Sequence, residues 1–384
     1  MTKRADVYGR YSRGSGAILK DPDRVWDILA DPDVLAGYEK SMRLDMAKSG
    51  IPLADLADWQ VMDVGTGRQA LTFVKFGAKR VSHFDISPEN VARMNDHIAT
   101  SALQDRLDTT CCDLVETDLG NERFDLVYLN GIVQHFSDVG RGLLNCIRAL
   151  KRGGYLWLYF YRSGTFDNFV LYMLRELVHG GNVVVDDAMM REYYVASCVF
   201  FSKTVAPNYL SSMFMDGVFT RFARLYAPAT YLTFTERCGL EVVSSSGLDP
   251  VGRDTDHVFA RAATVLTLRK DRDVSVEELN EAARLLAPSA EVNQLDPGHY
   301  RDPEIIRSIA LCRKLKSLLA GRNIAAAQTM FVVMRIFALL ARTIRAEGFD
   351  ATQRHPVLQQ MVESCIELIE REYGVSDHLS GVNA

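Results

Sequence analysis

Apolar and polar positions follow two different periods along the middle of this 384-residue chain. Short apolar runs suit buried strands, and between them apolar residues recur at helical spacing, as Val91, Met94 and Ile98 do. Strands that alternate with helices in this way predict a parallel sheet. The predicted strands are residues 61–64, 80–85, 124–129 and 155–160.

Local signals place the ends of two helices in this region. Ser87 and Pro88 predict a helix start, with serine as the N-cap and proline in the first helical position. Ser137 is predicted to cap the next helix, and Gly153 and Gly154 are predicted to end it before another strand.

The flanking regions are helical in pattern. Residues 1–58 are predicted to form a helical N-terminal cap, because two Asp-Pro-Asp sequences there are typical of helix starts. Residues 161–230 form a helical insertion, with its last helix at 209–225, which is either a lid over the sheet or ordinary helical core. Residues 271–384 are predicted to be a helical extension that docks on the same chain, forms a homodimer interface or binds a partner.

Composition fits a soluble enzyme. The net charge of −5 argues against broad nucleic-acid binding, which needs a basic surface. Seven cysteines without CxxC spacing indicate reduced thiols and a cytoplasmic setting. The start of the chain lacks a targeting pattern, and the apolar run 330–341 is too short to span a membrane. The eight histidines form no compact metal-binding pattern.

A glycine turn follows the first apolar run. Glycines at 65 and 67 let the backbone approach a ligand, and Asp85 at the next strand end can accept hydrogen bonds from ribose hydroxyls. Gly65, Gly67 and Ala70 also satisfy the dinucleotide fingerprint. A nicotinamide-dependent oxidoreductase is therefore one interpretation of this nucleoside pocket.

Two further acids favour S-adenosylmethionine as the cofactor. Asp63 stands two residues before the first glycine, where a carboxylate can hold the cationic methionyl end. Asp113 follows a third apolar stretch, where it could meet the adenine amine, although backbone contacts at Leu114 could serve that part of the pocket instead.

With these motifs in order, the chain resembles the class I S-adenosylmethionine-dependent methyltransferases. The resemblance covers about residues 55–160 strongly and 230–270 weakly, and Gln69 departs from it by standing where the family usually has a third glycine. The matching segments are 63–67, 83–87, 112–114, 124–130 and 150–154.

The resemblance implies an α/β fold over residues 59–270: a seven-stranded, mostly parallel Rossmann-like sheet with helices on both faces and a final antiparallel hairpin. It also implies a set of residues that bind the cofactor. They are Asp63, Gly65, Thr66, Gly67, Asp85, Ile86, Asp113, Leu114 and Asn130.

His135 is the candidate catalytic base. It follows the strand whose end faces the methyl group in this family, and a histidine suits proton removal from a hydroxyl or an amine. Packing and hydrogen bonding are the alternative roles for a histidine in this place. Tyr159, Tyr161 and Arg162 follow the next strand and are predicted to line the acceptor pocket, where Arg162 could pair with an acidic substrate.

These features predict a methyltransferase that acts on an O or N atom of a small molecule, such as a metabolite, a sugar or a natural-product intermediate. The aromatic insertion favours an enclosed pocket over a macromolecular groove. Three alternatives remain: a protein or RNA methyltransferase, the oxidoreductase, and a catalytically silent cofactor-binding subunit whose C-terminal helices bind its partner.

Overall fold

The computed structural model describes residues 32–163, 175, 220, 222–246, 263–288 and 293–295. The predictions for residues 1–31, for most of the insertion and for residues 296–384, which include the apolar run 330–341, lie outside these residues.

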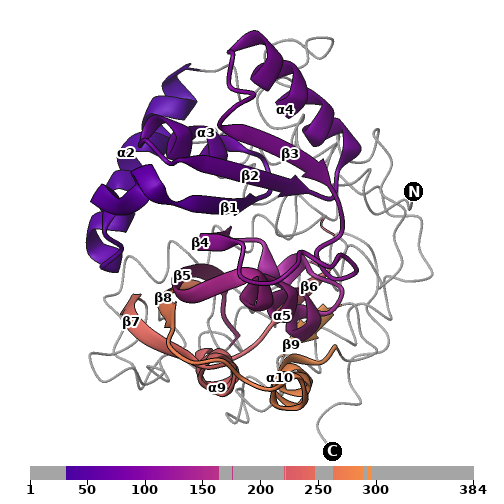
Figure 1. Ribbon diagram of the computed structural model, residues 1–384. Coiled ribbons are helices and arrows are strands. Elements are labelled where there is room, and N and C mark those ends of the chain that lie inside the picture. The colour runs from indigo at the N-terminus through magenta and orange to yellow at the C-terminus, as the bar shows by residue number, and fades with distance from the viewer. Residues whose placement is uncertain are drawn as a thin grey trace, which may run out of the picture.

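A seven-stranded mixed sheet organises the described chain (Figure 1). The strand order is β3-β2-β1-β4-β5-β8-β7, and every neighbouring pair from β3 to β5 is parallel. β8 pairs in the antiparallel direction with both β5 and β7. The predicted mostly parallel sheet with its closing hairpin is confirmed. The strands are β1 (Gln60–Val64), β2 (Arg80–Asp85), β3 (Leu107–Cys111), β4 (Phe124–Asn130), β5 (Leu150–Tyr161), β7 (Leu240–Ser246) and β8 (Ala263–Lys270).

Helices cover both faces of the sheet and form two apolar cores. Leu143, Phe234 and Leu286 belong to the core under α5, α9 and η3, whereas Met46 and Phe73 belong to the core under α2 and α3. The elements are α2 (Pro32–Ser49), η1 (Leu53–Asp58), α3 (Arg68–Lys75), α4 (Pro88–Thr100), η2 (Val133–His135), α5 (Val139–Ala149), α9 (Pro228–Arg237), α10 (Val276–Ala283) and η3 (Arg284–Leu286).

The predicted helix ends are right for α4 and wrong for α5. Ser87 caps α4 by accepting a hydrogen bond from the Asn90 N–H, and Pro88 occupies the first turn. α5 is instead capped by Asp138, whose Oδ1 accepts from the Arg141 N–H at 2.9 Å. That helix ends at Ala149 and β5 begins at the next residue, so the glycines at 153 and 154 lie within the strand rather than at the helix end.

The described end of the insertion is extended. Residues Ala223–Leu225 form β6, which pairs in parallel with β9 (Asn293–Leu295). The helix predicted for 209–225 is therefore wrong at its last three residues. Extended backbone here lets Tyr226 pair with Arg162 just beyond the end of β5, so the chain returns to the sheet at its carboxyl edge.

The described start of the C-terminal extension packs on the sheet domain. Ala282 and Leu286 lie in the same apolar core as α5 and α9, and the Tyr226 hydroxyl donates to the Leu286 carbonyl at 2.9 Å. Gly140 of α5 makes this approach possible, because a Cβ there would lie 2.3 Å from the Ala283 carbonyl oxygen.

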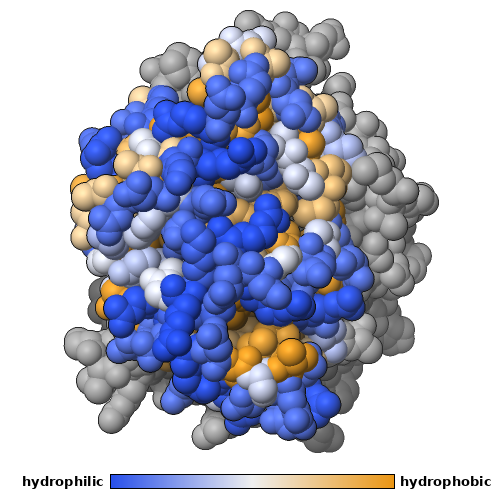
Figure 2. All heavy atoms as spheres, in the orientation of Figure 1, coloured by the Kyte–Doolittle hydropathy of each residue, from blue (hydrophilic) through white to orange (hydrophobic). Residues whose placement is uncertain are grey.

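The described surface is largely hydrophilic on the face seen in Figure 2, with small hydrophobic areas between hydrophilic side chains. Among the described residues, no helix is both long and apolar enough to cross a membrane. The same part of the chain holds no group of three metal-ligating side chains.

Candidate functional site

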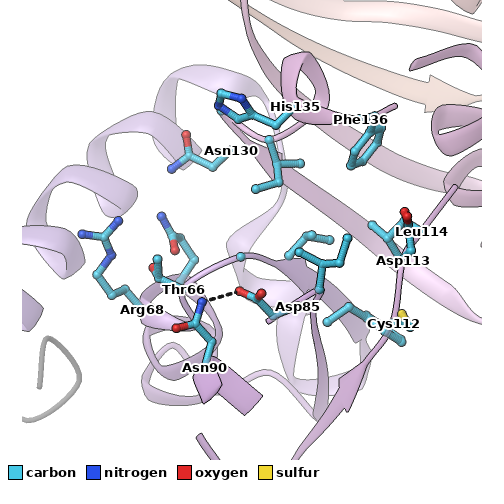
Figure 3. A pocket seen from close by; sticks show the side chains of 17 residues that line it. Thr66, Arg68, Asp85, Asn90, Cys112, Asp113, Leu114, Asn130, His135 and Phe136 are labelled. Carbon is cyan, nitrogen blue, oxygen red and sulfur yellow. Dashed lines mark hydrogen bonds between the residues drawn. The ribbon is translucent and has the colours of Figure 1, made fainter. Parts of the chain in front are cut away.

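A cavity opens at the carboxyl ends of the parallel strands, where ligands bind in open α/β sheets (Figure 3). The loops after β1, β2, β3 and β4 contribute its walls, so residues far apart in the sequence meet in one place. Eight of the predicted site residues line it: Gly65, Thr66, Asp85, Ile86, Asp113, Leu114, Asn130 and His135.

The glycine turn depends on backbone conformations that favour glycine. Gly65 and Gly67 have φ angles of 115° and 85°, in the region where a side chain adds strain. A Cβ on Gly67 would also lie 1.9 Å from the Met94 Cε atom of α4. Gly67 thus permits the tight turn and is the N-cap of α3, and it is not among the residues that line the cavity.

His83 stabilises the glycine turn through a hydrogen bond to its backbone. Its Nε2 lies 2.6 Å from the Gly65 carbonyl oxygen and its Nδ1 lies 2.7 Å from the Thr109 hydroxyl. Because a carbonyl only accepts, Nε2 carries the proton and Nδ1 accepts from the hydroxyl. Burial lowers the pKa of His83 to about 4, so the neutral ring persists at neutral pH.

Asp85 lies between the two ends of the cavity. Its Oδ1 accepts from the Ser87 N–H at 2.6 Å, and its Oδ2 accepts from the Asn90 side chain at 2.9 Å. Burial raises its pKa to about 7, against the lowering effect of these hydrogen bonds and of Arg93. Each carboxylate oxygen keeps a second lone pair, which suits it to ligand hydroxyl groups.

Asp63 is placed differently from the sequence-based expectation. It is fully buried, and its Oδ2 accepts from the Ala70 N–H at 3.0 Å, so it stabilises the first turn of α3. Burial raises its pKa to about 7. Asp63 is not among the residues that line the cavity.

The end of the cavity opposite the glycine turn combines apolar and polar groups. Cys112, Asp113 and Leu114 follow β3, and Phe136 faces them from the loop after β4 (Figure 3). Asp113 Oδ1 accepts from the Val115 N–H at 3.1 Å, which fixes this loop. A flat base fits between such apolar side chains, with polar atoms at its edge.

His135 connects the cavity with the end of the insertion. Its Nδ1 lies 3.0 Å from the Phe222 carbonyl oxygen, so Nδ1 carries a proton. Its Nε2 lies 3.2 Å from the Gln134 side-chain nitrogen, which also donates to the Gly131 carbonyl. The neutral imidazole therefore accepts from Gln134, and the Nε2 lone pair already has a protein donor.

The three residues predicted for the acceptor pocket do not line this cavity. Tyr159 packs behind Gly131, whose N–H donates to the Tyr159 carbonyl, and its ring contacts that of Tyr161. Arg162 is 2% exposed and pairs through its backbone with Tyr226. Their part in acceptor binding stays a prediction.

Several lining residues were not predicted from the sequence. Gln69 and Asn90 lie in the first turns of α3 and α4, which are the helices that follow β1 and β2. Their position directly after two candidate strand ends was the available signal. The remaining unpredicted lining residues are Val64, Arg68, Phe84, Cys112, Gly131, Ile132 and Phe136.

Comparison with known proteins agrees with this geometry. Residues 62–158 match the family model described as a methyltransferase domain. Over 101 residues, or 26% of the chain, the sequence is 33% identical to a ubiquinone biosynthesis O-methyltransferase of Nitrobacter winogradskyi, of which the match spans 37%. Over 130 residues it is 28% identical to a malonyl-[acyl-carrier protein] O-methyltransferase of Acetivibrio thermocellus, covering 32% of the chain and 43% of that relative.

The chain thus spans less than half the length of these curated relatives. A crystal structure of an S-adenosylmethionine-dependent methyltransferase from Mesorhizobium loti is 17% identical and covers 61% of this chain and 99% of its own, with a TM-score of 0.39. The family match shows a methyltransferase domain over residues 62–158, and the seven-stranded sheet that contains these residues has the mostly parallel order expected for that fold.

Proposed function

We propose that this protein transfers a methyl group from S-adenosylmethionine to an O or N atom of a small molecule. The observation that carries the proposal is the cavity at the ends of β1, β2 and β4, in which Asp85 lies beside the Gly65–Gly67 turn. The two curated relatives are named as O-methyltransferases, which favours oxygen as the acceptor atom.

The residues of the cavity fit the proposed cofactor. Asp85 would accept hydrogen bonds from the ribose hydroxyls, and Cys112, Leu114 and Phe136 would enclose the adenine. Asp113 would face the adenine edge, while Thr66 and Asn130 lie toward the other end. When bound, the sulfonium supplies an activated methyl group, so the protein mainly aligns the acceptor and excludes water.

The sheet also favours a methyltransferase over a dinucleotide-dependent oxidoreductase. The dinucleotide-binding fold has six parallel strands in the order 3-2-1-4-5-6. Here β8 follows β5 in the antiparallel direction and separates it from β7. Nicotinamide binding is therefore a control in the experiment below.

His135 is the proposed base for an acceptor whose hydroxyl or amine carries a proton. The Phe222 carbonyl holds the Nδ1 proton and leaves Nε2 as the basic nitrogen. Before Nε2 can take a proton from the acceptor, the hydrogen bond that Gln134 donates to it must break, and the acceptor hydroxyl or amine must donate to Nε2 instead. His135→Gln should lower kcat by about 10²–10⁴-fold if His135 is a general base. An unchanged kcat with a raised acceptor KM would assign it a positioning role.

The proposal is tested by calorimetric titration with S-adenosylmethionine, S-adenosylhomocysteine and NADH. This is followed by measurement of S-adenosylhomocysteine formation with a panel of phenols, carboxylic acids and amines. Saturable binding of the first two, and product formation with one acceptor class, is the expected result. Binding of NADH alone would exclude the proposed reaction. Cofactor binding without turnover on the panel would favour a macromolecular acceptor or a silent subunit.

A further inference from the structure

Three of the described arginine side chains are buried where the insertion returns to the sheet. Arg162 and Arg175 are each 2% exposed, and Arg224 is 4% exposed. Arginine is almost never fully buried in proteins unless it is paired, because removing the guanidinium charge from water is costly. Three such side chains in one part of the fold therefore indicate a region that favours an anionic group.

One short stretch of chain, which includes β6, joins the three arginines. Arg224 lies in β6 itself. Arg162 pairs through its backbone with Tyr226, the residue that follows β6. Arg175 donates from Nη2 to the Thr220 carbonyl oxygen at 2.6 Å, just before β6. The fold thus gathers positive charges from separate parts of the sequence.

The same stretch borders the cavity on the side of His135. Phe222 lies two residues before Arg224, and its carbonyl oxygen lies 3.0 Å from His135 Nδ1. The guanidinium carbon of Arg224 lies 5.2 Å from the centre of the Phe222 ring. Arg224 is not among the residues that line the cavity, whereas His135 is, opposite Asp85 in Figure 3. The charge of Arg224 would therefore act from just behind the cavity wall, where burial leaves it little screened.

The hydrogen bonds of His135 disfavour an acceptor that must first lose a proton. Nδ1 donates to the Phe222 carbonyl, and Nε2 accepts from the Gln134 amide. Gln134 is fully buried and donates also to the Gly131 carbonyl, which fixes the amide in this orientation. A phenol, with a pKa of about 10, would have to displace Gln134 before it could donate its proton to Nε2. A carboxylate is already ionised at neutral pH and needs no base.

We propose that the acceptor is a carboxylate, which the protein converts into its methyl ester, and that Arg162 and Arg224 attract it to the His135 side of the cavity. This inference rests on the proposed function and names the substrate class of the same site. A carboxylate oxygen attacks the methyl carbon, and the O–C bond forms as the S–C bond breaks with its electron pair returning to sulfur. The products are a neutral ester and S-adenosylhomocysteine. No proton is released, so His135 keeps both of its hydrogen bonds.

The first test offers the full-length protein two kinds of oxygen in one molecule. Each of 4-hydroxybenzoate and 4-hydroxycinnamate carries a carboxylate and a phenol, and chromatography separates the methyl ester from the methyl ether. With S-adenosylmethionine present, the ester is the expected product. The ether as main product, or turnover of simple phenols or amines alone, would overturn the proposal. If S-adenosylmethionine does not bind, the proposed function fails and this inference with it.

Binding decides the case in which the cofactor binds but neither compound is methylated. Benzoate and benzamide have similar shapes and differ in charge, so both are titrated into the protein saturated with S-adenosylhomocysteine. Benzoate should bind at least about fivefold more tightly than benzamide, because only benzoate is attracted by the buried arginines. Equal affinities, or no saturable binding of benzoate, would overturn the proposal.

Arg224→Met tests the part played by one buried charge. The variant should weaken benzoate about five- to tenfold and leave benzamide and S-adenosylhomocysteine within about twofold. Arg237→Met, on the exposed side of α9, is the matched control and should change none of the three affinities. Equal weakening of all three ligands by Arg224→Met would show that Arg224 only supports the fold, and an unchanged benzoate affinity would exclude Arg224 from the proposal. If Arg224→Met does not fold, the wild-type comparison of benzoate with benzamide still decides.

Discussion

Asp63 on β1 and Asp85 on β2 are both buried, and burial raises the pKa of each to about 7. Asp63 pairs in register with His83, so Asp85 stands two positions nearer the carboxyl edge of the sheet. Two positions correspond to roughly 7 Å along a strand. That displacement brings Asp85 into the cavity and leaves Asp63 under the first turn of α3.

The two carboxylates show that burial and a raised pKa do not by themselves identify a binding group. Structural hydrogen-bond networks also perturb pKa values. What separates the two sites is their place: Asp63 accepts from the Ala70 N–H and is not among the cavity-lining residues, whereas Asp85 lines the cavity. Substitutions at the two positions should therefore affect different properties, namely folding at Asp63 and ligand binding at Asp85.

The largest effect on nucleoside affinity is expected for Asp85→Asn. It should weaken S-adenosylhomocysteine binding about 30- to 100-fold, because the ribose hydroxyls lose a charged acceptor. Thermal stability should change little, since the wild-type carboxylate is itself costly to bury. Calorimetric titration and a thermal melt measure the two quantities. A large loss of stability with unchanged affinity would reverse the roles of the two acids.

The pH dependence of binding is expected to follow Asp85. Ribose hydroxyls favour the ionised carboxylate, and a pKa of about 7 leaves most of the group protonated at pH 6. The dissociation constant for S-adenosylhomocysteine should therefore rise about tenfold between pH 8 and pH 6. The dependence should vanish in Asp85→Asn and persist in Asp63→Asn. The opposite pattern would assign the titrating group to Asp63.

Asp63→Ala should act on folding instead. Removing the acceptor for the Ala70 N–H should cost about 1–2 kcal/mol in the free energy of unfolding, as for the loss of a helix cap. Asp63→Asn keeps an acceptor oxygen and is the matched control. Denaturant unfolding at pH 6 measures both variants, and nucleoside affinity should stay within about threefold of the wild type, well below the effect of Asp85→Asn.

The pH dependence of unfolding provides a check on the same residue. The folded-state pKa of Asp63 is raised above its usual value of 3.8, so its contribution to stability is full below about pH 4 and is lost as the pH rises through 7. The free energy of unfolding of the wild type, taken relative to that of Asp63→Asn, should therefore fall between pH 5 and pH 8. A relative stability of the wild type that rises over this range would contradict the raised pKa.

Among the substitutions of residues that line the cavity, the smallest effect on nucleoside affinity is expected for Asn90→Ala. Asn90 donates to Asp85 Oδ2 at 2.9 Å and so positions the carboxylate. Its loss should weaken nucleoside binding about three- to tenfold, the value of one hydrogen bond. Asn95→Ala, on the exposed side of the same helix, is the control. Equal effects of the two variants would exclude a positioning role for Asn90.

The sequence by itself determined the parts of the fold that depend on consecutive residues. Short apolar runs, the glycines at 65 and 67 and the Ser87-Pro88 helix start were sufficient to predict strands, a glycine turn and α4. These features are local because backbone conformation and helix capping depend on neighbours a few residues away. Asp85 was identified for the same reason, as the acid that ends a strand.

Only the tertiary structure decided what the remaining side chains face. Strand register separates Asp63 from Asp85, and the packing of α3 brings Gln69 to the cavity. His83 reaches a carbonyl 18 residues away, and His135 reaches one 87 residues away. Such partners depend on how strands and helices pack, because side chains on a strand alternate between its faces and their contacts lie on other elements.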